Sequence, residues 1–123
     1  MEKRNEIVEL SLEFALLIIE YTEVLESQKK YVIARQLLRS GTSIGANIRE
    51  SQSAESRADF IHKLKIAHKE AHETEYWLLL CEKSISYSSP SQEMKNILLS
   101  IQKLLNKIIG TTKINKSIPN SKA

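Results

Sequence analysis

The stretch Gln36-Leu-Leu-Arg-Ser-Gly-Thr-Ser-Ile-Gly-Ala-Asn-Ile-Arg-Glu50 decides the fold of this chain, because it places glycines and small polar residues inside a helical apolar pattern. Gly41 and Gly45 lie four residues apart, so on a helix they share one face and let a neighbouring backbone approach closely. The apolar stripe keeps its phase through both glycines, which predicts an unbroken helix. The alternative is a helix capped by Gly41 and followed by a loop over residues 42–47.

Three further segments carry helical patterns. Residues 2–26 have apolar side chains at alternating steps of three and four, with glutamates between them. The capping-box pattern of Ser56-Arg-Ala-Asp59 predicts the start of a third helix, and Ser89-Pro90-Ser91-Gln92, with Ser89 as the cap, predicts the start of a fourth that ends at Gly110. We therefore predict an all-α, up-down-up-down four-helix bundle over residues 1–110, followed by a flexible basic tail over residues 111–123.

The third predicted helix has a heptad seam that contains small residues. The seam runs through Phe60, Leu64, Ala67, Ala71, Thr74, Leu78, Cys81 and Ile85. Ala67 and Ala71 make it thin in the middle, as Gly41 and Gly45 do for the second helix. We expect these two helices to cross at the short end of the usual interaxial range, with the four small residues at the crossing. In the fourth helix we expect the following residues to point inward: Met94, Ile97, Ile101, Leu104 and Ile108.

Beside the glycines runs a polar stripe of Ser43, Asn47 and Glu50. If buried, these groups need hydrogen-bond partners. The candidates on the third helix are Arg57, His68, Glu73 and Thr74. Our main interpretation is a structural network that fixes the register between helices or subunits. The alternative is a ligand-binding or catalytic pocket formed by Asn47, Glu50, Glu73 and His68.

Other patterns for catalysis and metal binding are incomplete. His68, His72 and Glu75 have helical spacing for one metal ion, but three ligands on one helix need others to fix the geometry, so a solvated or interface stripe is favoured. Gly41 and Gly45 lack the lysine of a phosphate-binding loop. Cys81 lies on the heptad seam, which favours a packing thiol over a nucleophile. We predict no enzymatic activity and no cofactor.

Charge is segregated along the chain. The net charge is +3, and residues 1–27 hold seven glutamates against Lys3 and Arg4, whereas residues 29–69 hold nine Lys or Arg against three acidic residues. Attraction between the first two helices explains this pattern simply. The alternative is an electropositive surface for RNA or DNA. Its residues would be Arg35, Arg39, Arg49, Arg57, Lys63, Lys65 and Lys69.

The segments Ser43-Ile-Gly-Ala-Asn-Ile48 and Ser56-Arg-Ala-Asp-Phe-Ile61 resemble the bacterial four helix bundle protein family. That family includes proteins encoded in intervening sequences of large-subunit ribosomal RNA genes, and it is similar to the accessory variability protein of diversity-generating retroelements. The resemblance implies a ring-like homopentamer of bundles and an accessory role with RNA or DNA. The body of this chain is neutral, which departs from the strongly basic surface expected of the retroelement protein.

Apolar side chains outside the predicted seams indicate association. They are Ile18, Ile33, Ile61, Ile66, Trp77, Leu79, Leu80, Leu98 and Ile109, and Tyr76 adds a further contact candidate. The first hypothesis is therefore a non-enzymatic homo-oligomer with weak, salt-sensitive nucleic-acid binding. The alternative is a scaffold module that docks a protein partner. With one cysteine and no apolar run of membrane-spanning length, we expect a cytoplasmic protein without a membrane segment.

Overall fold

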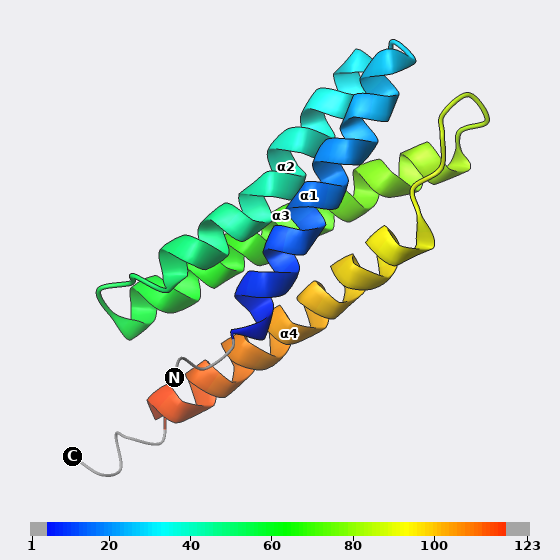
Figure 1. Cartoon of the computed structure of the whole chain (residues 1–123). Coiled ribbons are helices and arrows are strands. Elements are labelled where there is room, and N and C mark those ends of the chain that lie inside the picture. Colours follow the sequence, from blue (N-terminus) through cyan, green and yellow to red (C-terminus); the bar gives the residue numbers. More distant parts are fainter. Residues whose placement is uncertain (1–4, 118–123) are drawn as a thin grey trace.

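Four helices form the fold in the computed structural model, which describes residues 5–117, with side chains placed through residue 113. They are α1 (Glu6–Ser27), α2 (Tyr31–Ser51), α3 (Arg57–Lys83) and α4 (Gln92–Ser117). Short connections make consecutive helices antiparallel (Figure 1). α1 and α3 each pack against both α2 and α4. This confirms the all-α bundle prediction, and no strand occurs among residues 5–117.

Serine hydroxyls fix the starts of α3 and α4. Ser56 Oγ accepts a hydrogen bond from the Asp59 backbone N–H at 3.0 Å, as the capping box predicts. α4 begins later than predicted, because the Met94 N–H donates to Ser91 Oγ at 3.1 Å and leaves Ser89 outside the helix. Ser91 is therefore the N-cap residue, and its hydroxyl binds the N–H of the third helical residue, the usual partner of a capping serine.

α2 continues through its glycines, as predicted, but the glycines face α1 rather than α3. A β-carbon on Gly41 would lie 2.8 Å from Ile18 Cγ1, and one on Gly45 would lie 3.4 Å from the Ser11 carbonyl oxygen. The prediction that Gly41 and Gly45 meet Ala67 and Ala71 is therefore wrong. Helical periodicity gives the face that a residue occupies, and it does not say which neighbour covers that face.

The core confirms most of the predicted seam of α3. Ala67, Ala71, Thr74 and Cys81 are fully buried, whereas Ile85 lies beyond the helix end and is fully exposed. In α4 the buried stripe is displaced by about one position, so the expected Ile97, Leu104 and Ile108 are only half-buried. Several residues that we predicted to lie outside the core are part of it: Ile18, Ile61, Leu98 and Ile109.

α4 does not end at Gly110. It runs to Ser117, and Gly110 has helical backbone geometry with open space where a side chain would lie. A glycine ends a helix when it adopts a left-handed conformation, and Gly110 does not. Residues 111–117 of the predicted flexible tail are thus helical, and residues 118–123 lie outside the described residues.

The two glycines of α2 should respond differently to alanine. Both substitutions gain about 1 kcal/mol of helix propensity. At Gly41 the new methyl group meets the fully buried Ile18, and such overpacking typically costs about 1–3 kcal/mol. Gly45→Ala meets only ordinary contacts. We expect Gly41→Ala to be less stable than Gly45→Ala by about 1–3 kcal/mol in urea unfolding. Equal stability would show that α1 is not held against Gly41.

Candidate nucleic-acid interface and groove

The antiparallel pairing of α3 and α4 brings the start of α3 beside the end of α4. Lys95 Nζ pairs with Glu82 at 3.0 Å, and about two α4 turns further along, Gln102 Nε2 donates to Glu75 at 3.3 Å. The same register brings Lys65 close to Lys113. Because two like charges repel, the Lys113 side chain lowers the pKa of the Lys65 ammonium. Residues 57–69 and 107–113, distant in sequence, therefore lie at the same end of the molecule (Figure 1).

This end of the α3–α4 pair is rich in lysine. We call it the basic end and define it by four exposed residues: Lys65, Lys69, Lys107 and Lys113. Among the described residues of α4, Glu93 is the one acidic residue, and it lies at the opposite end of that helix. Lys103 and Lys107 were not among the predicted cations, because basic character was expected in residues 29–69 and in the tail. Lys103 and Lys107 lie four apart on one helix face, and this spacing was the available signal.

Two of the seven cations predicted to bind nucleic acid are engaged by carboxylates. Arg39 donates to Glu70 at 3.1 Å and also pairs with Glu73. Lys63 Nζ lies 2.9 Å from Glu50, and this hydrogen bond raises the pKa of Lys63.

The other five predicted cations differ in their surroundings. Arg35 lies over the Tyr31 ring at 5.9 Å. Arg49, Arg57, Lys65 and Lys69 are exposed, and the first three form no ion pair within residues 5–117. Lys65 and Lys69 therefore belong with the lysines of α4, whereas Arg35 and Arg39 lie on another part of the bundle.

The predicted polar stripe bonds mainly within its own helix. Ser43 Oγ donates to the Arg39 carbonyl oxygen at 2.6 Å, and Asn47 Nδ2 donates to the Ser43 carbonyl oxygen at 2.9 Å. These two residues do not form the expected link between helices. Glu50 does reach α3 through Lys63, and Glu73 accepts from Trp77 Nε1 at 3.1 Å as well as from Arg39.

The buried polar link between α2 and α3 is formed by Ser40 and Thr74. Their hydroxyl oxygens lie 2.8 Å apart, and both side chains are fully buried. Thr74 was predicted to join a network, but Ser40 was missed. The signal for Ser40 was its position in phase with Leu37 and Ile44, both of which are buried. A hydroxyl at such a position needs a partner inside the core.

Two histidines lie close together where α3 faces α4. The His68 and His72 rings meet edge to face with centroids 4.5 Å apart, and His68 Nε2 is buried without a hydrogen-bond partner. Burial, followed by the His72 charge, lowers the pKa of His68, and nearby Asn106 opposes this shift. His72 Nδ1 lies 3.7 Å from Glu75. No cluster of three or more histidine, cysteine or acidic side chains within residues 5–117 is suited to hold a metal ion.

Cys81 is fully buried, and burial raises the pKa of its thiol, which disfavours the nucleophilic thiolate. Within the described part of the chain, none of the helices has the length and apolar character needed to span a membrane.

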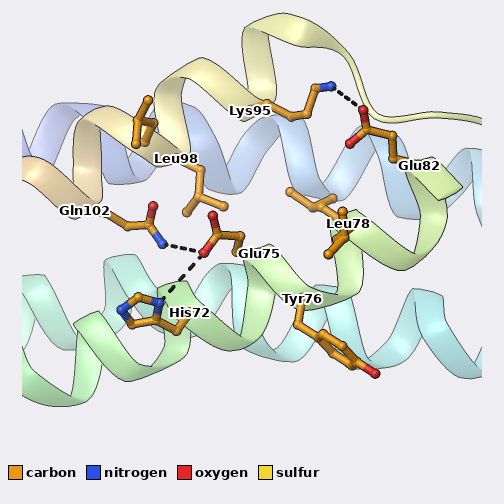
Figure 2. Close-up of a pocket in the computed structure, with 10 residues that line it drawn as sticks. His72, Glu75, Tyr76, Leu78, Glu82, Lys95, Leu98 and Gln102 are labelled. Carbon is orange, nitrogen blue, oxygen red and sulfur yellow. Dashed lines mark hydrogen bonds and ion pairs between the residues drawn. The ribbon is translucent and has the colours of Figure 1, made fainter.

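A groove between α3 and α4 lies beside His72 (Figure 2). It has a volume of about 350 Å³, and Leu78 and Leu98 contribute its buried apolar part. Tyr76, Leu79 and Leu99 line it and remain about half exposed. Polar pairs close both ends: His72 and Gln102 with Glu75 at one, and Lys95 with Glu82 at the other. The groove therefore presents an apolar surface between two polar boundaries.

Comparison with known proteins identifies the family. A family model described as "23S rRNA-intervening sequence protein" matches residues 3–108, so the chain belongs to this family, as its sequence motifs indicated. A crystal structure from Bacteroides thetaiotaomicron, described as a protein with unknown function from the S23 ribosomal protein family, is 48% identical. The alignment covers 84% of this chain and 97% of that chain, with a TM-score of 0.79. A search of curated proteins gave no match.

The lowered pKa of His68 predicts sensitivity to mild acid. In the unfolded chain the imidazole titrates near its ordinary value of 6.5, and in the folded protein it binds a proton less readily. The contribution of this group to stability is therefore present above a pH of about 6.5 and is lost as the pH falls toward the lower folded value. When the pH is lowered from roughly 7.5 to roughly 5.5, we expect the free energy of unfolding to fall more in the wild type than in the His68→Gln variant. Urea unfolding at each pH measures this difference.

His62→Gln is the matched control, because His62 is exposed on the same helix. It should follow the wild type across this pH range. If His68→Gln and the wild type lose stability in parallel, His68 is not the group that titrates.

Proposed function

We propose that this protein is a non-enzymatic, self-associating four-helix bundle that binds nucleic acid weakly through the basic end of α3 and α4. The observation that carries the proposal is the convergence of exposed lysines from two helices on one end of the molecule. Lysine ammonium groups bind phosphates by charge, and they release counterions in doing so. Such binding has little sequence preference and falls steeply with salt.

The opposite charge gathers on α1. Residues 6–27 contain six glutamates and no lysine or arginine. This helix would be repelled by a phosphate backbone, so the molecule favours one orientation on a polyanion. The net charge of +3 thus understates the local field at the basic end, because it averages a basic surface with an acidic one.

Self-association strengthens this mode of binding. Each chain offers few phosphate contacts, and an oligomer would present several basic ends to one strand. The ring-like homopentamer expected from the family resemblance remains a prediction, and light scattering coupled to gel filtration would measure the subunit number. The family name refers to 23S ribosomal RNA intervening sequences, which makes RNA the first probe to use.

A role without catalysis is consistent with the chemistry of the described residues. The thiol of Cys81 is buried, and Glu50, Glu73 and His68, which would form a pocket in the catalytic alternative, are dispersed among separate contacts. Glu50 and Glu73 are each held by a cation, and His68 faces His72 instead of either carboxylate. A general base and a nucleophile need to lie within hydrogen-bond distance of one another.

Removing lysines from the basic end should weaken RNA binding and its salt dependence together. We expect Lys65→Gln/Lys69→Gln/Lys107→Gln to lower the slope of log K against log salt by about 2, since each lost contact to single-stranded RNA accounts for about 0.7. The measurement is fluorescence anisotropy of a labelled single-stranded RNA between about 50 and 200 mM salt.

The control Lys29→Gln/Lys30→Gln/Lys83→Gln removes the same charge at the other end of the bundle. It should retain most of the wild-type affinity. Equal loss in both variants would show that binding follows net charge alone. Absence of salt-dependent binding by the wild type at about 50 mM salt would refute nucleic-acid binding.

A further inference from the structure

Two lysines meet across the outer seam between α3 and α4. Lys65 of α3 lies close to Lys113 of α4, and both side chains are exposed. The parts of the two helices around this point, residues 60–69 and 103–113, contain no aspartate or glutamate. Like charges repel, so this arrangement is unfavourable by itself. An anion bound between the two ammonium groups would remove the repulsion.

Gly110 belongs to the row of α4 residues that faces this seam. Asn106 faces α3, because its side chain lies close to His68. Lys113 faces α3 as well, because it lies close to Lys65. Gly110 is four residues after Asn106 and three before Lys113, the spacing that places residues in one row along a helix. A β-carbon on Gly110 would have nothing within 4 Å, so the row has an open gap beside Lys113.

Packing within the described residues does not require a glycine at position 110. Its backbone is helical and has no positive φ angle, and no neighbouring atom would meet a side chain there. Glycine inside a helix is disfavoured relative to alanine. It does let a ligand approach the backbone closely. The open space at Gly110 therefore suits a group that binds against α4 beside the two lysines.

We propose that Lys65, Lys113 and the open space at Gly110 form a binding site for one phosphate group of RNA. A lysine ammonium binds phosphate as a point charge, so lysines from two helices can bind different oxygens of the same phosphate. The inference rests on the proposed function and assigns one phosphate contact within the basic end. A free phosphate ion offers the same chemistry, so inorganic phosphate is the second probe.

A bulky residue at position 110 should block the site without harming the fold. Leucine is a better helix former than glycine, so Gly110→Leu should be at least as stable as the wild type in urea unfolding. Its side chain would fill the space beside Lys113. We expect its RNA affinity, measured by fluorescence anisotropy, to fall to about that of Lys65→Gln. A purely structural role for Gly110 would not combine undiminished stability with weaker binding.

Thr111→Leu is the matched control. Thr111 is exposed and follows Gly110 directly, but it lies on another side of α4, in a hollow that it shares with Asn5 and Glu6 at the start of α1. This variant should bind RNA like the wild type. If Gly110→Leu also binds like the wild type, the site is refuted, whereas the salt dependence of wild-type binding still decides the proposed function.

The two lysines should act as one unit. Lys65→Gln and Lys113→Gln are each expected to lower the slope of log K against log salt by about 0.7, since each leaves one phosphate without its contact. The double variant should lower the slope by about 0.7 as well, because either substitution alone empties the site. A decrease of about 1.4 would mean that the lysines contact separate phosphates, which contradicts a shared site.

Inorganic phosphate tests the site without RNA. When phosphate replaces chloride at constant ionic strength, we expect the Gly110 amide signal of the wild type to shift in NMR spectra. The double lysine variant should lose this shift. If the shift occurs but the wild type binds no RNA, the site takes free phosphate and its assignment to RNA is wrong. If neither probe binds, the site and nucleic-acid binding are both refuted.

Discussion

The fit of Ile18 into the space left by Gly41 is the contact on which the arrangement of this bundle depends. With no β-carbon at that position, the fully buried Ile18 side chain lies directly against the α2 backbone. This contact fixes how α1 is rotated about its own axis. One row of α1 is thereby committed to the core, and Leu12, Leu16 and Ile19 are left on the outside. The close approach of two backbones thus determines the exposed apolar surface.

On its other side, α2 is fixed by a polar contact. The buried hydroxyls of Ser40 and Thr74 satisfy one another, and a shift of α3 along α2 would leave both without this partner. Arg39 and Glu50 add ion pairs to α3 from the rim of the same interface. Together the apolar and polar contacts give α2 one register with each of its two neighbours, α1 and α3.

The distribution of charge follows from the order of the helices. An antiparallel α3–α4 pair places the basic first part of α3 beside the basic last part of α4, and the acidic α1 occupies a different position in the bundle. A chain with a small net charge thereby acquires one basic end and one acidic helix. The same pairing forms the apolar groove between α3 and α4, so the basic end and the groove both arise from one helix contact.

The sequence by itself determined the four helices, the continuity of α2, the capping box of α3 and most of the α3 seam, because these depend on periodicity and on hydrogen bonds between nearby residues. It also carried the motifs of the family. It did not determine that Gly41 meets Ile18, that Ser40 pairs with Thr74 or that the α4 lysines join Lys65 and Lys69. Those contacts depend on the rotation and register of helices that are distant in the chain. Only tertiary packing decides these two quantities, since a helical pattern is the same whichever neighbour covers it.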